Sequence, residues 1–140
     1  MEIGLVSCTK SKRDSPSTPR DLYDMSALLR KARAYCENHH DAWHIPSAKH
    51  GLLDPDGQSI EPYDETLTNA RVAERRSWAE RVAEQMEGVD LLTYDVELVV
   101  HAGKAYYEYL LPLVESEVES IWIPTEGLAI GETLAWYGEH

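Results

Sequence analysis

Polar side chains able to bind or transform a ligand gather in four short segments of this sequence, residues 7–13, 47–51, 101–104 and 125–127. Each segment directly follows an apolar run that predicts a β-strand. In open α/β sheets, ligands bind outside the carboxyl ends of the strands. We therefore expect these segments, which are far apart in the chain, to meet at one edge of a sheet and surround one site.

Lysine is scarce in this protein, and most of its lysines fall in these segments. Of five lysines, Lys10, Lys12 and Lys49 lie in the first two segments and Lys104 lies in the third. Because the chain carries a net charge of −12, this concentration predicts a local site for an anion such as a phosphate or carboxylate. The alternative is that these are ordinary polar surface loops. The other predicted ligand-binding residues are Ser7, Thr9, Ser47, Tyr63, His101, Gly103 and Thr125.

Four residues are candidates for catalytic chemistry: Cys8, His50, Asp64 and Glu126. A thiol just past a strand and flanked by lysines would be stabilised as a thiolate, and His50 or His101 would act as its base. A small residue packed at the strand end is the alternative reading of Cys8. Asp64 and Glu126 would act as general acids or bases, and Glu126 would also suit a ribose hydroxyl.

Neither a metal nor a cofactor is predicted. The two cysteines, Cys8 and Cys36, lack the spacing of a zinc site, and Cys36 fits a helix core. His39 and His40 end a predicted helix, where a cation suits the dipole, so we interpret them as capping residues. The glycine-rich phosphate motifs of nucleoside triphosphate and dinucleotide sites are absent.

The elements that must position these residues alternate along the chain. Apolar runs predict strands at 3–7, 42–48, 96–100 and 120–123, and helical spacing predicts helices at 25–36, 68–87, 103–114 and 130–137. Ser26 would cap the first helix, Pro112 would interrupt the third, and Pro46 would place the second strand at an edge. The pattern predicts one three-layer α/β domain over residues 1–140, with a mainly parallel four-stranded sheet and helices on both faces.

Composition narrows the classes of function. No apolar stretch approaches a membrane span, and the start of the chain lacks a secretory signal, so we expect a cytoplasmic protein without a membrane partner. A strongly acidic chain disfavours broad electrostatic binding to nucleic acid. An acidic, lysine-poor surface is also typical of proteins that work in high salt, which favours a haloarchaeal source.

The blocks Ser7–Lys12, Asp21–Tyr23, Ser47–Leu53 and Pro62–Leu67 resemble a family of small domains from archaea, bacteria and phages. Its marks are Ser-Cys-x-Lys-x-Lys and Ser-Ala-Lys-x-Gly-Leu, and no activity is established for it. The blocks are more distantly similar to bacterial peroxide-stress proteins that bind DNA. They are also similar to the uracil-DNA-glycosylase-like domains found beside archaeal tRNA-guanine transglycosylases.

The glycosylase similarity implies a parallel sheet in the order 2-1-3-4 and a nucleobase or nucleoside near the strand ends. The chain departs from glycosylases after its first and fourth strands. Ser-Cys-Thr-Lys and Pro-Thr-Glu-Gly stand there in place of the Gly-x-Asp-Pro-Tyr and His-Pro-Ser segments. Glycosylase catalysis is therefore not implied by the motifs themselves.

Three functions compete on these observations. The first is a domain that binds a small anionic or nucleotide-like ligand, with hydrolysis of an N-glycosidic bond as its reaction. The second is a non-catalytic module that makes a local contact with RNA or DNA. The third is a thiol enzyme that depends on Cys8. The sequence predicts no oligomeric state.

Overall fold

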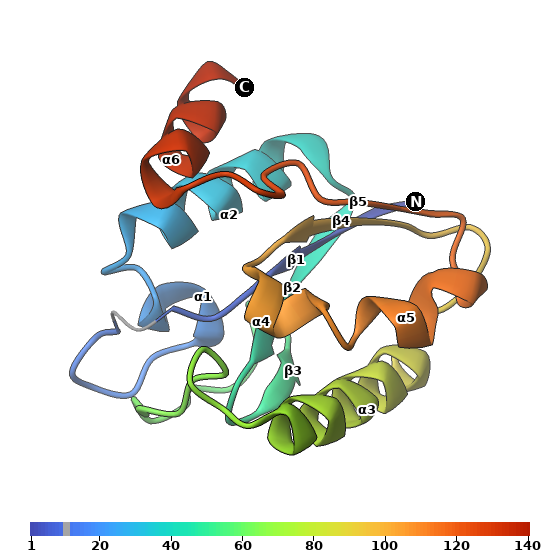
Figure 1. The fold of residues 1–140 in the computed structure, drawn as a ribbon. Helices are drawn as coiled ribbons and strands as arrows, with labels where there is room; N and C mark the ends of the chain where they lie inside the picture. Colours follow the sequence, from blue (N-terminus) through green and yellow to red (C-terminus); the bar gives the residue numbers. More distant parts are fainter. Residues whose placement is uncertain (10–11) are drawn as a thin grey trace.

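The computed structural model describes residues 1–9 and 12–140 and contains a five-stranded mixed sheet. Four strands are parallel: β1 (Glu2–Val6), β2 (Ala42–Ser47), β4 (Glu97–His101) and β5 (Ser120–Trp122). They lie in the order β2-β1-β4-β5, and β3 (Gly51–Leu53) pairs antiparallel to β2 at the edge. Figure 1 shows the sheet running through the middle of the molecule.

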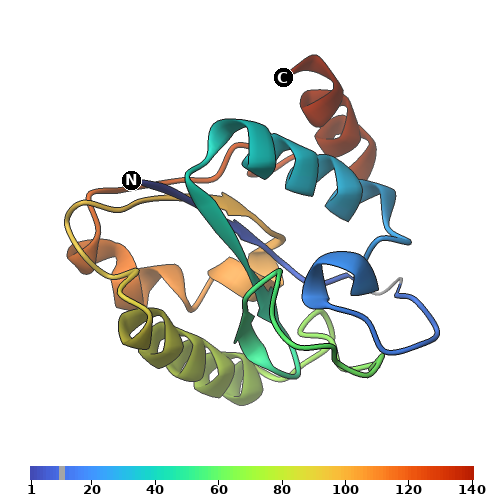
Figure 2. The ribbon, with the colours of Figure 1, turned by 180° about the vertical axis from the view of Figure 1, so that it is seen from behind.

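Helices cover both faces of the sheet (Figures 1 and 2). One face carries α2 (Ala27–His39) and α6 (Ile130–Glu139), which contact each other. The other carries α3 (Val72–Gly88), α4 (Lys104–Tyr107) and α5 (Leu111–Val114). Two short helices complete the fold, α1 (Pro19–Leu22) and the 3₁₀ turn η1 (Glu115–Glu117). Among the described residues, no helix has both the length and the hydrophobicity to cross a bilayer.

The general α/β class and the main helices are confirmed. Helix α2 begins after Ser26, whose hydroxyl accepts a hydrogen bond from the Leu29 amide at 3.2 Å. Helix α3 buries Trp78, Val82 and Met86, the side chains whose four-residue spacing predicted its inner face. Pro112 stands at the start of α5 and separates it from α4. A proline is tolerated in a first helical turn because no amide hydrogen is needed there.

The expected four-stranded sheet with β2 at its edge is wrong, because β3 occupies that edge. Pro46 pairs with Leu52 of β3 and gives its carbonyl to the Cys8 amide at 3.4 Å. A strand residue directs its nitrogen and carbonyl to the same side, so the missing amide hydrogen of Pro46 faces away from β3. Pro46 also lies beyond Leu5↔His44, which is the last residue pair between β1 and β2. The proline therefore removes no hydrogen bond from the β2–β3 ladder.

The central strand β1 approaches α2 closely at Gly4. A Cβ atom at this position would lie 2.8 Å from both Cys36 Sγ and His40 Cδ2. We expect Gly4→Ala to lower the free energy of unfolding by about 1–3 kcal/mol, the usual cost of overpacking a core. Urea denaturation measures this change. Gly138→Ala in α6 is the control, since a Cβ there meets nothing within 4 Å. Equal stability of the two variants would contradict the prediction.

Candidate functional site

The four predicted segments meet at the carboxyl ends of the strands, the last of them through Thr125, which lines one cavity with Ser7 and His101. The Ser7 amide donates to the His101 carbonyl at 3.3 Å, and the Ala48 amide lies 3.4 Å from Cys8 Sγ. The sheet extends from β1 to β2 in one direction and to β4 and β5 in the other. The point between β1 and β4 is therefore the topological switch point, where open α/β sheets bind ligands.

The predicted residues do not share one cavity. Most of them are divided among three cavities, and Ser47, Lys49, His50 and Tyr63 line none of the three. The first, which we call the α2–α6 cavity, has a volume of about 220 Å³. The second, the β1–α4 cavity, has a volume of about 420 Å³. A third, more superficial hollow is lined by Gly103, Lys104, Thr125 and Glu126. Thr9 lines both of the first two cavities.

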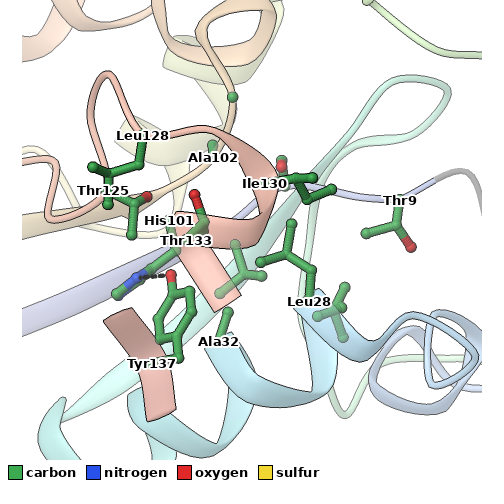
Figure 3. A pocket seen from close by; sticks show the side chains of 14 residues that line it. Thr9, Leu28, Ala32, His101, Ala102, Thr125, Leu128, Ile130, Thr133 and Tyr137 are labelled. Atoms are coloured by element: carbon green, nitrogen blue, oxygen red, sulfur yellow. Dashed lines mark hydrogen bonds between the residues drawn. The ribbon is translucent and has the colours of Figure 1, made fainter. Parts of the chain in front are cut away.

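The α2–α6 cavity is mainly apolar and lies between the carboxyl ends of β1 and β4 and the helices α2 and α6 (Figure 3). Its apolar wall comes from Leu28, Ala32, Leu128 and Ile130. His101 supplies the imidazole of this cavity. The predicted residues that line it are Ser7, Thr9, His101, Gly103 and Thr125.

The β1–α4 cavity is lined by three charged side chains, whereas the α2–α6 cavity is lined by no aspartate, glutamate, lysine or arginine among the described residues. Asp64 and Glu65 are exposed at its wall, opposite the buried Cys8 and Tyr106. Thr9, Lys12, Thr66, Thr68 and Asn69 complete the lining. Its ionisable lining thus pairs one ammonium with two carboxylates, which suits a ligand that donates hydrogen bonds. Lys10, a predicted anion ligand, lies outside the described residues.

Lys12 is positioned by aromatic rings. Its Nζ lies 4.5 Å from the ring centroid of Tyr63 and 5.9 Å from that of Tyr23, both cation–π distances. Burial lowers the pKa of Lys12, and electrostatic interactions with Cys8, Asp64 and Glu65 act in the opposite direction. Because the ammonium covers a face of Tyr63, a planar ligand would stack on that face only after Lys12 moves.

The hydroxyls of Ser47 and Tyr63 are used inside the protein. They lie 2.5 Å apart, and the Tyr63 hydroxyl also bonds that of Tyr23. The Ser47 hydroxyl accepts a further hydrogen bond from the His50 amide at 3.2 Å. Both predicted ligand-binding residues are buried, at 0% and 6% exposure. They therefore brace the loop after β2 against the wall of the β1–α4 cavity.

Cys8 is packed and hydrogen-bonded. Its Sγ lies 3.3 Å from the Tyr106 hydroxyl and 3.4 Å from the Ala48 amide. Among the described residues, neither hydrogen-bond partner of Cys8 is an imidazole that could act as a base for the thiol. His50 packs its ring edge-on to Tyr63 at 5.3 Å, and its buried Nε2 has no hydrogen-bond partner among the described residues. Burial lowers the pKa of His50, with Lys49 and Arg81 acting in the same direction.

The remaining charged candidates stand apart from Asp64. Lys49 is exposed, and its carbonyl accepts a hydrogen bond from Arg81 at 3.2 Å. Lys104 and Glu126 are exposed on the third hollow. Cys8, Lys49 and Glu126 therefore do not line a common cavity with His101.

The sequence reading of His40 as a simple capping residue is incomplete. Its amide does cap α2 by donating to the Cys36 carbonyl, but its side chain is fully buried. His40 Nδ1 lies 2.5 Å from Glu2 Oε1, and its Nε2 lies 3.0 Å from Nε2 of His101. Cys36 and His40 are four residues apart, a spacing that places two side chains on one helix face, and this signal was available in the sequence.

A continuous polar chain therefore runs from Glu2 through both imidazoles to the α2–α6 cavity. His101 Nδ1 lies 2.7 Å from the Tyr137 hydroxyl, which Figure 3 shows beside the cavity. Burial raises the pKa of the Tyr137 phenol, and the nearby Thr125 side chain acts in the opposite direction. Burial, with a smaller contribution from His40, lowers the pKa of His101 to about 3. His101 is therefore neutral near neutral pH.

Fold and site together define an open α/β protein with two cavities at the switch point of its sheet. The chain belongs to DUF6884, a family of unknown function, whose model matches residues 3–139. Neither the curated proteins nor the solved structures include one that matches it.

The buried His101 predicts acid sensitivity. Histidine in an unfolded chain has a pKa of about 6.5, so His101 is protonated below this pH when the protein is unfolded. In the folded protein His101 stays neutral, and this difference destabilises the folded state as pH falls. The free energy of unfolding should therefore fall as pH decreases from 6.5 towards 3, by up to about 1.4 kcal/mol per pH unit for this group. Urea denaturation at several pH values, with EDTA present, measures the slope.

His101→Gln should show a shallower fall in the free energy of unfolding between pH 6.5 and pH 5 than the wild type. His39→Gln is the control, because it removes an exposed histidine at the end of α2. If His101→Gln retained the full wild-type slope, His101 would be protonated in the folded state and the prediction would be wrong.

Proposed function

We propose that this protein binds a nucleoside- or nucleotide-like ligand in the β1–α4 cavity. The observation that carries the proposal is a cavity of about 420 Å³ at the switch point of the sheet, walled by Asp64, Glu65 and Lys12. Small-molecule sites typically span about 300–1,000 Å³ and combine apolar walls with a few placed polar groups. The resemblance to glycosylase-like domains points to the same ligand class.

The side chains of the cavity suit the hydrogen bonds of a nucleoside. Carboxylates such as those of Asp64 and Glu65 accept from exocyclic amino groups and sugar hydroxyls. The hydroxyls of Thr9 and Thr66 both donate and accept. The aromatic wall is Tyr106, which is itself held edge-on by Trp78 at a centroid distance of 5.6 Å.

Charge selects among the ligands of this class. Lys12 is the ammonium that lines the described cavity, and it faces two carboxylates. A triphosphate brings several negative charges next to Asp64 and Glu65, where like charges repel. A neutral nucleoside, or a monophosphate whose single phosphate meets Lys12, suits the cavity better.

A binding experiment tests this proposal directly. Wild-type protein is screened by thermal shift and calorimetry against nucleobases, nucleosides and nucleoside monophosphates. We expect a nucleoside or monophosphate to raise the Tm, and Asp64→Asn to weaken its binding about tenfold or more, because a hydrogen bond to a charged group contributes about 1.5–3 kcal/mol.

Asp14→Asn is the matched control, since it removes the same charge from an exposed residue that lines none of the three cavities. The proposal fails if no compound of the panel binds, or if Asp14→Asn weakens binding as much as Asp64→Asn does. A different result would identify a module that binds nucleic acid: affinity for oligonucleotides that falls steeply as the salt concentration rises, with no such fall in the affinity for nucleosides.

The reaction we propose for a bound nucleoside is hydrolysis of its N-glycosidic bond. Asp64 would take a proton from water as the water oxygen bonds to the anomeric carbon. As the carbon–nitrogen bond breaks, the departing base would take a proton from solvent, and Asp64 would return its proton to solvent, so that one water is consumed. Chromatography should detect free base with the wild type and at least tenfold less with Asp64→Asn. Binding without release of base would establish a binding domain and overturn the hydrolytic step alone.

A further inference from the structure

A second cluster, separate from the β1–α4 cavity, brings together three side chains with metal-binding chemistry. Cys36 Sγ and one ring nitrogen each from His40 and His101 all lie within 4.8 Å of one another. The two imidazoles face each other through their Nε2 atoms, which are 3.0 Å apart. Cys36 is fully buried, and His101 is 5% exposed. Neutral imidazole and thiolate are the ligands preferred by Zn²⁺ and related transition metals.

The outer nitrogens of both imidazoles already have the partners that metal-bound histidines use. His40 Nδ1 lies 2.5 Å from the Glu2 carboxylate, and His101 Nδ1 lies 2.7 Å from the Tyr137 hydroxyl. A carboxylate only accepts, so His40 carries its proton on Nδ1. If Tyr137 accepts from His101 in the same way, both Nε2 lone pairs point into the cluster. Such outer partners fix the tautomer and orientation of histidine ligands.

The backbone of β1 makes room for these side chains at Gly4. Gly4 faces Cys36 and His40, and any Cβ there would approach both to 2.8 Å. The ring of Tyr35 lies over the cluster, with centroid distances of 5.4 Å to both His40 and His101. The three donors come from the end of α2 and the end of β4, so one ion would join a helix to the central sheet.

We propose that Cys36, His40 and His101 form a binding site for a divalent transition metal of the zinc class. Tetrahedral zinc holds two histidine nitrogens about 3.3 Å apart and a sulfur about 3.6 Å from each nitrogen, given bond lengths of about 2.0–2.3 Å. The imidazoles are thus nearly in place, since their Nε2 atoms lie 3.0 Å apart, and Cys36 Sγ lies within 4.8 Å of the ring nitrogens. Three protein ligands leave a fourth position for water, the arrangement of catalytic rather than purely structural zinc sites.

The metal site goes beyond the proposed nucleoside site and does not depend on it. Of its three ligands, His101 lines the α2–α6 cavity, as does Tyr137, the outer partner of His101. The β1–α4 cavity lies on the α4 side of the sheet and has none of the three ligands in its lining. Nucleoside binding measured with EDTA present therefore tests the first proposal alone.

Cobalt titration of the full chain tests the metal site. Co²⁺ bound to a thiolate gives a charge-transfer band in the near ultraviolet that histidine-only surface sites lack. We expect this band in the wild type with a stoichiometry of about one ion per chain, its loss in Cys36→Ser, and its retention in Cys8→Ser. Zn²⁺ should displace the Co²⁺ and raise the Tm, and EDTA should reverse that rise.

A matched pair of histidine variants locates the site. His40→Gln should weaken Zn²⁺ binding at least tenfold in equilibrium dialysis, whereas His39→Gln, at the neighbouring exposed position, should leave it unchanged. Absence of the charge-transfer band in the wild type would overturn the proposal, whether or not Cys36→Ser folds. Equal loss of zinc in His39→Gln and His40→Gln would also overturn it, because it would indicate binding at the helix surface.

Discussion

Backbone pairing of β1 with both β2 and β4 is the constraint on which the rest of the molecule depends. It places residues 7–9 at the switch point of the sheet, where the Ser7 amide bonds the His101 carbonyl and the Cys8 amide bonds Pro46. The α2–α6 cavity and the β1–α4 cavity both open at this point, one on the α2 side of the sheet and one on the α4 side. Because the chain passes between them, Thr9 lines both. A ligand in either cavity would therefore contact the same short loop.

The same geometry explains why the predicted single site divides. Strict alternation along β1 would place Cys8 on the face of Gly4 and Val6, toward α2. Instead, Val6 and Ser7 both line the α2–α6 cavity, whereas Cys8 lines the β1–α4 cavity. The change of side occurs where the strand ends after Val6. Residue types located the rim correctly, but which face each loop residue meets depends on how the chain leaves the strand, and no periodic pattern records that.

The sequence predicted best where a long apolar pattern dominates the local energy. Helix α2 and the buried face of α3 follow from spacing and capping, because burial of one helix face outweighs weaker preferences. It predicted worst where tertiary contacts decide. The three-residue strand β3 is too short to show alternation, and the hydrogen bond of the Leu52 amide to Gln85 at 2.8 Å covers its outer edge from 33 residues away. The burial of the His40 side chain likewise depends on Glu2 and His101, which are distant in the chain.

The buried cluster of Cys36, His40 and His101 between α2 and the sheet costs folding free energy, because imidazoles must be desolvated to form it. Apolar side chains in place of Cys36, His40 and His101 would pack this interface without desolvating imidazoles, and buried polar groups are tolerated only when they are satisfied. Here satisfaction needs Glu2 from β1 and Tyr137 from α6, together with a glycine at position 4 to make space. Elements from both ends of the chain thus converge on two imidazoles. Buried imidazoles that need polar partners from distant elements and a glycine beside them are typical of a functional site. Selection for core stability alone would favour apolar side chains at these positions.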